Sequence, residues 1–171
     1  DTATFTGSGT LVKQGSGTFT VSSSSPLFTG GTTVSAGSIG LTGSLSGSAV
    51  TLSGGTLDVS GAGIHTIGSL TGTTHATVAA GATLATGGNN TSTSFSGDIT
   101  GSGNLTKQGS GTFSLVNTLT LFGTTTISAG TLDLGVDLTN SPVIVSGGTL
   151  ATTVAGVHTI PSLAATSGST S

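Results

Sequence analysis

The chain has 171 residues, of which 37 are Thr, 27 are Ser and 31 are Gly, and its two Lys and five Asp give a net charge of −3. Glu, Arg, Cys, Met, Trp and Tyr are absent, which excludes sites that need a glutamate pair, an arginine clamp, a thiolate or a zinc–cysteine cluster. Two separated Lys cannot neutralise several phosphates, so nucleic acid is not expected as a partner, and no apolar run reaches the roughly 20 residues of a membrane-spanning helix.

Single apolar residues alternate with Thr, Ser or Gly along most of the chain. This period of two is typical of half-buried strands, and the frequent Thr, Ser and Gly leave no window with good helix propensity. A mean hydropathy of +0.38 with almost no charge argues against disorder. We therefore expect an all-β fold.

A long repeat organises the predicted strands. TGSGTLVKQGSGTF at 6–19 recurs as TGSGNLTKQGSGTF at 100–113, with 12 of 14 positions identical. Further along, VTLSGGTL at 50–57 matches VIVSGGTL at 143–150, and GIHTIGSL at 63–70 matches GVHTIPSL at 156–163. We predict one domain over 1–171, built from two units of about 93 residues at 1–93 and 94–171, the second incomplete at its C-terminal end.

Glycine turns recur at a shorter period inside each unit. Each turn lies between two stretches of alternating apolar and polar residues. They are spaced 18 to 28 residues apart, about 22 on average, which is typical of a parallel β-solenoid with three short strands per coil and indicates about eight coils. We expect these glycines to form the positive-φ corners, with Thr and Ser on the outer faces. The predicted turn motif consists of Gly15, Gly37, Gly55, Gly81, Gly109, Gly130 and Gly148.

Four phenylalanines occupy equivalent positions in the two units. Phe19 matches Phe113, and Phe28 matches Phe122. We predict that they form part of the inward-facing ladder, with an exposed contact patch at Phe28 and Phe122 as the alternative because Leu-Phe precedes a turn in both copies.

The stretch from Phe95 to Phe113, FSGDITGSGNLTKQGSGTF, resembles the passenger-associated repeat of bacterial autotransporters, F-x-G-x-I-x-G-x-G-x-L-x-K-x-G-x-G. The copy from Phe5 to Phe19 is similar to the latter part of that pattern. The resemblance implies a right-handed β-helix that is secreted and displayed in the passenger of a Gram-negative cell-surface protein.

Candidate chemical sites all have structural interpretations. His65 and His158 are equivalent, but they lie about four coils or ~20 Å apart, too far to share a metal ion. Asp133 and Asp137 would lie about 13 Å apart on an extended strand, too far for a glycosidase pair. Lys13 and Lys107 recur in one turn motif, which indicates turn chemistry. We expect no enzyme activity, catalytic residue, metal or cofactor.

We therefore predict an extracellular or cell-surface structural or adhesive solenoid, either a head-to-tail fibre or matrix subunit or an autotransporter-like stalk. The alternatives are an ice-binding Thr-rich solenoid and, less favoured, a polysaccharide-active β-helix enzyme. Neither end of the chain reads as a cap, so we expect either a longer array or end-to-end stacking of copies into a homo-oligomer. Without Trp, Tyr or Arg anchors, contacts with other surfaces or glycans should be weak and multivalent.

Overall fold

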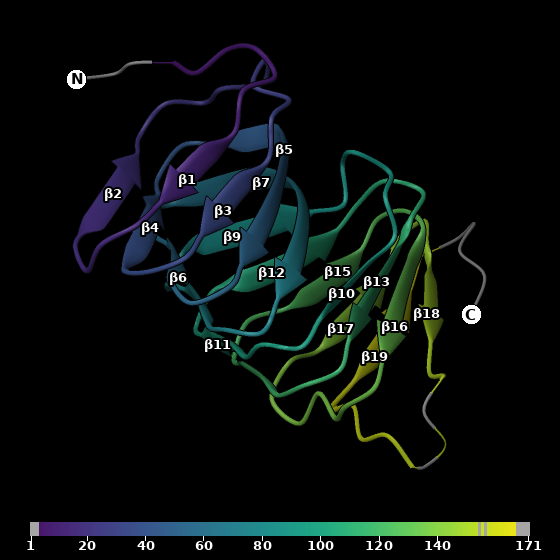
Figure 1. The fold of residues 1–171 in the computed structure, drawn as a ribbon. Coiled ribbons are helices and arrows are strands. Elements are labelled where there is room, and N and C mark those ends of the chain that lie inside the picture. The colour runs from purple at the N-terminus through teal and green to yellow at the C-terminus, as the bar shows by residue number, and fades with distance from the viewer. Residues whose placement is uncertain (1–3, 154, 156, 167–171) are drawn as a thin grey trace.

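The structure is a computed structural model that describes residues 4–153, 155 and 157–166. Over these residues the chain forms 19 strands and no helix, wound into a solenoid of about eight turns (Figure 1). The predicted all-β solenoid is confirmed, with coils about 20 residues apart. Among the described residues there is no helix of the length and apolarity needed to cross a membrane.

The strands stack in parallel to form three faces. The first face contains β1 (Leu11–Lys13), β3 (Thr32–Val34), β5 (Leu45–Leu52), β7 (Gly63–Gly72), β10 (Thr93–Phe95), β13 (Thr112–Leu115), β16 (Thr131–Leu134) and β18 (Thr149–Ala151). The second contains β2 (Thr18–Val21), β4 (Ser38–Leu41), β6 (Thr56–Val59), β8 (Ala76–Val78), β11 (Ile99–Gly101) and β14 (Leu119–Leu121). The third contains β9 (Ala82–Thr86), β12 (Asn104–Lys107), β15 (Thr125–Ile127), β17 (Val143–Val145) and β19 (Leu163–Ala165).

Strand β7 joins the first face to the third. Its beginning, Gly63 to Thr66, pairs with β9, whereas Ser69 to Gly72 pair with β5. Strand partners on the first face are separated by 18 residues, as from Thr32 to Val50, up to 23 residues, as from Gly72 to Phe95. Loops at the corners absorb most of this variation, and an irregularity between Leu45 and Ala49 shifts the register of β5 against β7.

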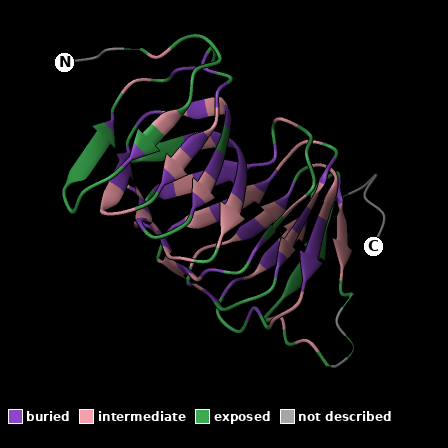
Figure 2. Ribbon diagram, viewed as in Figure 1, coloured by how far each residue is buried: buried purple, intermediate pink, exposed green. Residues whose placement is uncertain are grey.

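The core consists of columns in which each coil contributes one side chain at a given register position. On the second face, Ile39, Leu57, Ala76, Ile99 and Leu119 are successive partners, and all five are buried. Their strand neighbours point outward because side chains alternate along a strand. The period-two pattern of the sequence is thus converted into apolar ladders along the solenoid axis. Figure 2 shows buried positions recurring from one strand to the next.

The two copies of the long repeat lie on different faces. Leu11 belongs to β1 on the first face, whereas its equivalent, Leu105, belongs to β12 on the third. Four coils along the first face lead from Leu11 to Thr93, and Leu105 lies twelve residues beyond Thr93. The long repeat therefore spans four coils plus the path from one face to the next.

The close approach of neighbouring coils at a corner predicts the effect of a single methyl group. A Cβ added to Gly97 would lie 1.6 Å from the carbonyl oxygen of Thr74, whereas a Cβ at Gly9 would meet nothing within 4 Å. We expect Gly97→Ala to lower the unfolding free energy by about 2 kcal/mol or more, the range of overpacking, and Gly9→Ala to have little effect. Denaturant unfolding followed by circular dichroism measures both, and equal stability of the two variants would contradict this packing.

Candidate functional site

Two buried lysines form the same structure in both copies of the repeat. Lys107 is fully buried, and its Nζ donates hydrogen bonds to the carbonyl oxygens of Gln108 (2.8 Å), Gly109 (2.8 Å) and Ala129 (3.1 Å). An ammonium group has three N–H donors, so these three carbonyls satisfy it completely. The first two carbonyls belong to its own turn and the third to the next coil. We call this arrangement the lysine corner.

Lys13 forms the equivalent lysine corner on the first face. Its Nζ donates to the carbonyls of Gln14 (2.9 Å), Gly15 (2.7 Å) and Ala36 (3.1 Å). The lysine corners are structural, because each of them ties two successive coils together and uses all three N–H donors of the ammonium on main-chain carbonyls. The turn chemistry predicted for the K-Q-G motif thus has a specific geometry.

Glycine makes room for the ammonium on the neighbouring coil. Gly130 has a φ of +66°, and a Cβ there would lie 2.8 Å from Nζ of Lys107. Its equivalent, Gly37, has a φ of +68°, and a Cβ there would lie 2.6 Å from Nζ of Lys13. Sequence reasoning missed this partnership, although the separations of 23 and 24 residues, close to one coil, carry the signal.

The seven predicted corner glycines divide into two kinds. Gly15, Gly37, Gly81, Gly109 and Gly130 have positive φ. Gly55 and Gly148 do not, which corrects the expectation that all seven would have it. At these two positions glycine is required because a side chain would not fit. A Cβ at Gly55 would lie 2.5 Å from a methyl carbon of Val34 on the preceding coil, and a Cβ at Gly148 would lie 2.5 Å from a methyl carbon of Ile127.

Some hydroxyl groups lie inside the solenoid, where sequence reasoning placed only apolar residues. Buried Thr125 and Ser141 share a hydrogen bond of 2.8 Å between their side-chain oxygens, and Ser141 also donates to the carbonyl of Gly123 at 2.6 Å. Thr32 and Ser48 form the same pair in the first unit. The recurrence of both residues at an offset of 93 was the only signal in the sequence. It does not show whether a hydroxyl points into the solenoid or towards water.

The four predicted ladder phenylalanines differ in burial. Phe28 and Phe113 are buried, whereas Phe19 is 37% and Phe122 is 65% exposed. Phe19 occupies an inward position opposite Ile39, and it is exposed because β2 is the outermost strand of its face.

Phe122 points outward, which corrects its assignment to the ladder. In this copy Leu121 is buried, whereas Leu27, the equivalent of Leu121, is exposed and Phe28 is buried. A slip of one residue therefore exchanges the two side chains between core and surface.

The histidines and aspartates bind neighbouring coils. His65 is buried, with its ring nitrogens 3.0 Å from the carbonyl of Gly43 and 3.2 Å from that of Gly61. The side chain of Asp133 accepts hydrogen bonds from Ser114 (3.1 Å) and from the Thr153 hydroxyl (2.8 Å).

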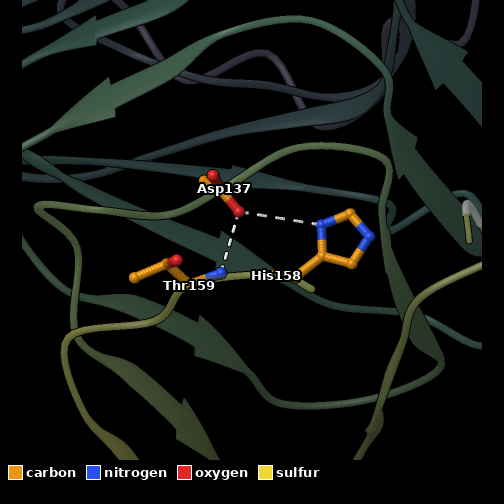
Figure 3. A network of polar contacts seen from close by, with 3 residues as sticks. All are labelled: Asp137, His158 and Thr159. Atoms are coloured by element: carbon orange, nitrogen blue, oxygen red, sulfur yellow. Dashed lines mark hydrogen bonds and ion pairs between the residues drawn. The ribbon is translucent and has the colours of Figure 1, made fainter. Parts of the chain in front are cut away.

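Near the C-terminal end, Asp137 accepts a bond from the Thr159 amide at 2.8 Å and lies 3.9 Å from the His158 ring (Figure 3). Within the described ranges, no three His, Cys, Asp or Glu side chains lie where they could hold a metal ion.

The ice-binding alternative needs threonines that line up from coil to coil on one face, and four of them do so on the second face. Thr20, Thr77, Thr100 and Thr120 occupy the same outward column of the second face. Gly40 and Asp58 interrupt this column between Thr20 and Thr77. The second face therefore carries an interrupted column of threonines and not a continuous one.

The first coil leaves an apolar groove open. The groove has a volume of about 350 Å³ and is lined by Leu11, Val12, Lys13, Gln14 and Phe19. In the second copy the equivalents Leu105, Lys107 and Phe113 are covered by β9 and β10 and are fully buried. The groove is therefore the surface of the repeat that a further coil covers elsewhere in the same molecule.

The geometry can now be compared with known proteins. The family model named passenger-associated-transport-repeat matches residues 11–39 and 105–134, the segments that contain the two lysine corners. This confirms the resemblance to autotransporter passenger repeats. No curated protein and no solved structure matches the chain.

The lysine corner of the second matched segment, 105–134, should contribute strongly to stability. Lys107→Met keeps much of the aliphatic stem but leaves three carbonyls without their donor, and a buried unsatisfied group costs about 1–3 kcal/mol. We expect the unfolding free energy to fall by about 3 kcal/mol, and by less in Lys13→Met, because Lys13 keeps 9% of its surface exposed. Denaturant titration of both variants tests this, and an unchanged midpoint for Lys107→Met would contradict it.

The same lysine predicts a pH dependence. Burial lowers the pKa of the Lys107 ammonium below its ordinary value of 10.5. Between the lowered value and 10.5 the unfolded chain holds more protons on this amine than the folded chain, so the unfolding free energy rises with pH. The stability difference between the natural chain and Lys107→Met should therefore grow as the pH rises from the lowered pKa of Lys107 towards 10.5. A difference that shrinks over this range would show that the carbonyls favour the charged form more than burial opposes it.

Proposed function

We propose that the chain is a non-catalytic structural segment of an exported, cell-surface β-helix passenger. The single observation that carries the proposal is the passenger repeat, which matches at two places and coincides at both with a lysine corner of the solenoid. The family's name ties the repeat to passenger transport, and a solenoid is a fold that extends along one axis by adding similar coils. The proposed role is to form a length of rigid stalk.

The chemistry of the polar side chains supports a structural role. The Asp133 carboxylate and the His65 ring are engaged between coils, and both lysines are enclosed by carbonyls. A catalytic acid, base or nucleophile needs access to a substrate, which these groups lack. A structural role therefore accounts for these four polar residues.

A stalk is also favoured over an adhesive surface. Tight protein interfaces usually contain buried Trp, Tyr or Arg anchors, and the sequence has none of these residues. The outward columns consist largely of Thr and Ser, as in the column of Thr77, Thr100 and Thr120. Such a surface suits contact with water and weak, multivalent contact with glycans or other surfaces.

Surface display in a Gram-negative host tests the proposal. Residues 1–171 carrying an epitope tag would be placed between an export signal and an autotransporter translocator domain, and intact cells would be treated with protease. We expect the tag to be removed from intact cells while the solenoid resists cleavage. The matched control is Gly97→Ala, which should be exported but cleaved faster, because the added methyl group opens the coil stack. A tag that stays protected inside cells while a control passenger is displayed would overturn the proposal.

A further inference from the structure

We propose that the outer surface of the first face binds the surface of an ice crystal. The binding surface consists of two adjacent columns of hydroxyl side chains that run through four successive coils, and we call it the hydroxyl array. This activity goes beyond the structural role proposed above and does not depend on it. The eight residues of the hydroxyl array are Thr33, Ser35, Thr51, Ser53, Thr71, Thr73, Ser94 and Ser96.

Strand pairing aligns the first column of the hydroxyl array. Thr33 is the parallel partner of Thr51, and Thr51 is the partner of Thr71. One register position further along, β7 pairs with β10, which places Ser94 next in the column. Side chains alternate between core and surface along a strand, so these four hydroxyl groups lie on the outside of the solenoid.

Main-chain hydrogen bonds keep the second column in step with the first. Each of its members lies two positions after a member of the first column, just beyond the end of the strand. Their amides all donate to a carbonyl of the preceding coil, at 2.9 to 3.0 Å, as the Ser53 amide does to Val34. All four side chains of this column are exposed. The pairing between coils therefore extends past the strands and aligns both columns.

The hydroxyl array is regular in two directions. Neighbouring coils lie about 4.8 Å apart, and alternate residues of one strand lie about 6.6 Å apart. Both distances are comparable with the repeat distances of oxygen atoms on a prism face of hexagonal ice. Each hydroxyl group donates one hydrogen bond and accepts up to two. Water molecules that bind to the hydroxyl array are therefore held near positions of the ice lattice.

The hydroxyl array is also uncharged. Between residues 31 and 98 the ionisable side chains are those of Asp58, His65, His75 and Asp98. His65 is buried, and the other three belong to the second face. A charged group holds its own hydration shell, which does not fit into an ice lattice, whereas a neutral hydroxyl group can bond to lattice water. The charge distribution thus leaves the first face as the neutral, regular surface that ice requires.

Growth of a single ice crystal in a solution of the purified chain tests the proposal. We expect a faceted crystal, with growth arrested over a measurable temperature interval below the melting point. Thr51→Lys places a long charged side chain in the middle of the hydroxyl array and should shorten this interval severalfold. Thr51→Ser keeps the hydroxyl group and should retain most of it.

The matched control is Thr106→Lys. It makes the same change at an outward, half-buried position of β12 on the third face, and it should retain the interval of the natural chain. Circular dichroism confirms that each variant is folded.

Three results would overturn the proposal. They are round, unfaceted crystals in the presence of the natural chain, an equal loss of the interval in the two lysine variants, and binding to insoluble cellulose without binding to ice. All of these measurements use the purified chain and are independent of export. Failure of surface display would therefore leave the ice-binding proposal intact, and failure of ice binding would leave the stalk role intact.

Discussion

The structure depends on parallel pairing between successive coils. No coil can satisfy its own backbone or bury its own side chains, because the strand partners and the next apolar layer both come from the neighbouring turn. This constraint explains why contacts about 20 residues apart recur through the whole molecule. It also explains how buried polar groups such as Lys107 and Ser141 are tolerated, since they are paired across a coil boundary with the carbonyls of Ala129 and Gly123.

The lysine corner shows how the coil boundary selects particular residues. A tight turn leaves several carbonyl oxygens pointing inward, and an ammonium group can bind three of them at once. The neighbouring coil must then lack a Cβ at the point of contact, which only glycine provides. The lysine therefore contacts one glycine in its own turn and requires another on the next coil. The structural motif thus includes Gly37 or Gly130 in addition to the contiguous K-Q-G residues. Because all these contacts are local to a corner, the same motif works on the first face and on the third.

Much of the fold could be predicted from the sequence, because the period of two and the glycine spacing are direct consequences of strand and coil geometry. The passenger repeat was also recognisable, since it is a continuous stretch with fixed spacing. The orientation of Phe122 was not predictable, because Leu121 and Phe122 are both apolar and only the pairing of β14 decides which of them faces inward. The inward position of Thr125 and Ser141 was likewise not predictable from the sequence. A Thr or Ser residue is written the same way whether its hydroxyl bonds to a partner inside the solenoid or faces water.

The displacement of the repeat by one face places its two copies in different surroundings. If the repeat spanned a whole number of coils, β12 would lie on the same face as β1. The strand that covers β12, which is β9, would then also lie on that face. Instead, β9 and β12 lie on the third face, and β1 lies on the first. The same strand sequence is therefore covered by a neighbouring coil on the third face, as β12 is by β9, and forms the outermost described strand on the first face, as β1 does. The burial of a residue in this solenoid thus depends on whether a neighbouring coil covers its strand, and not on its own sequence.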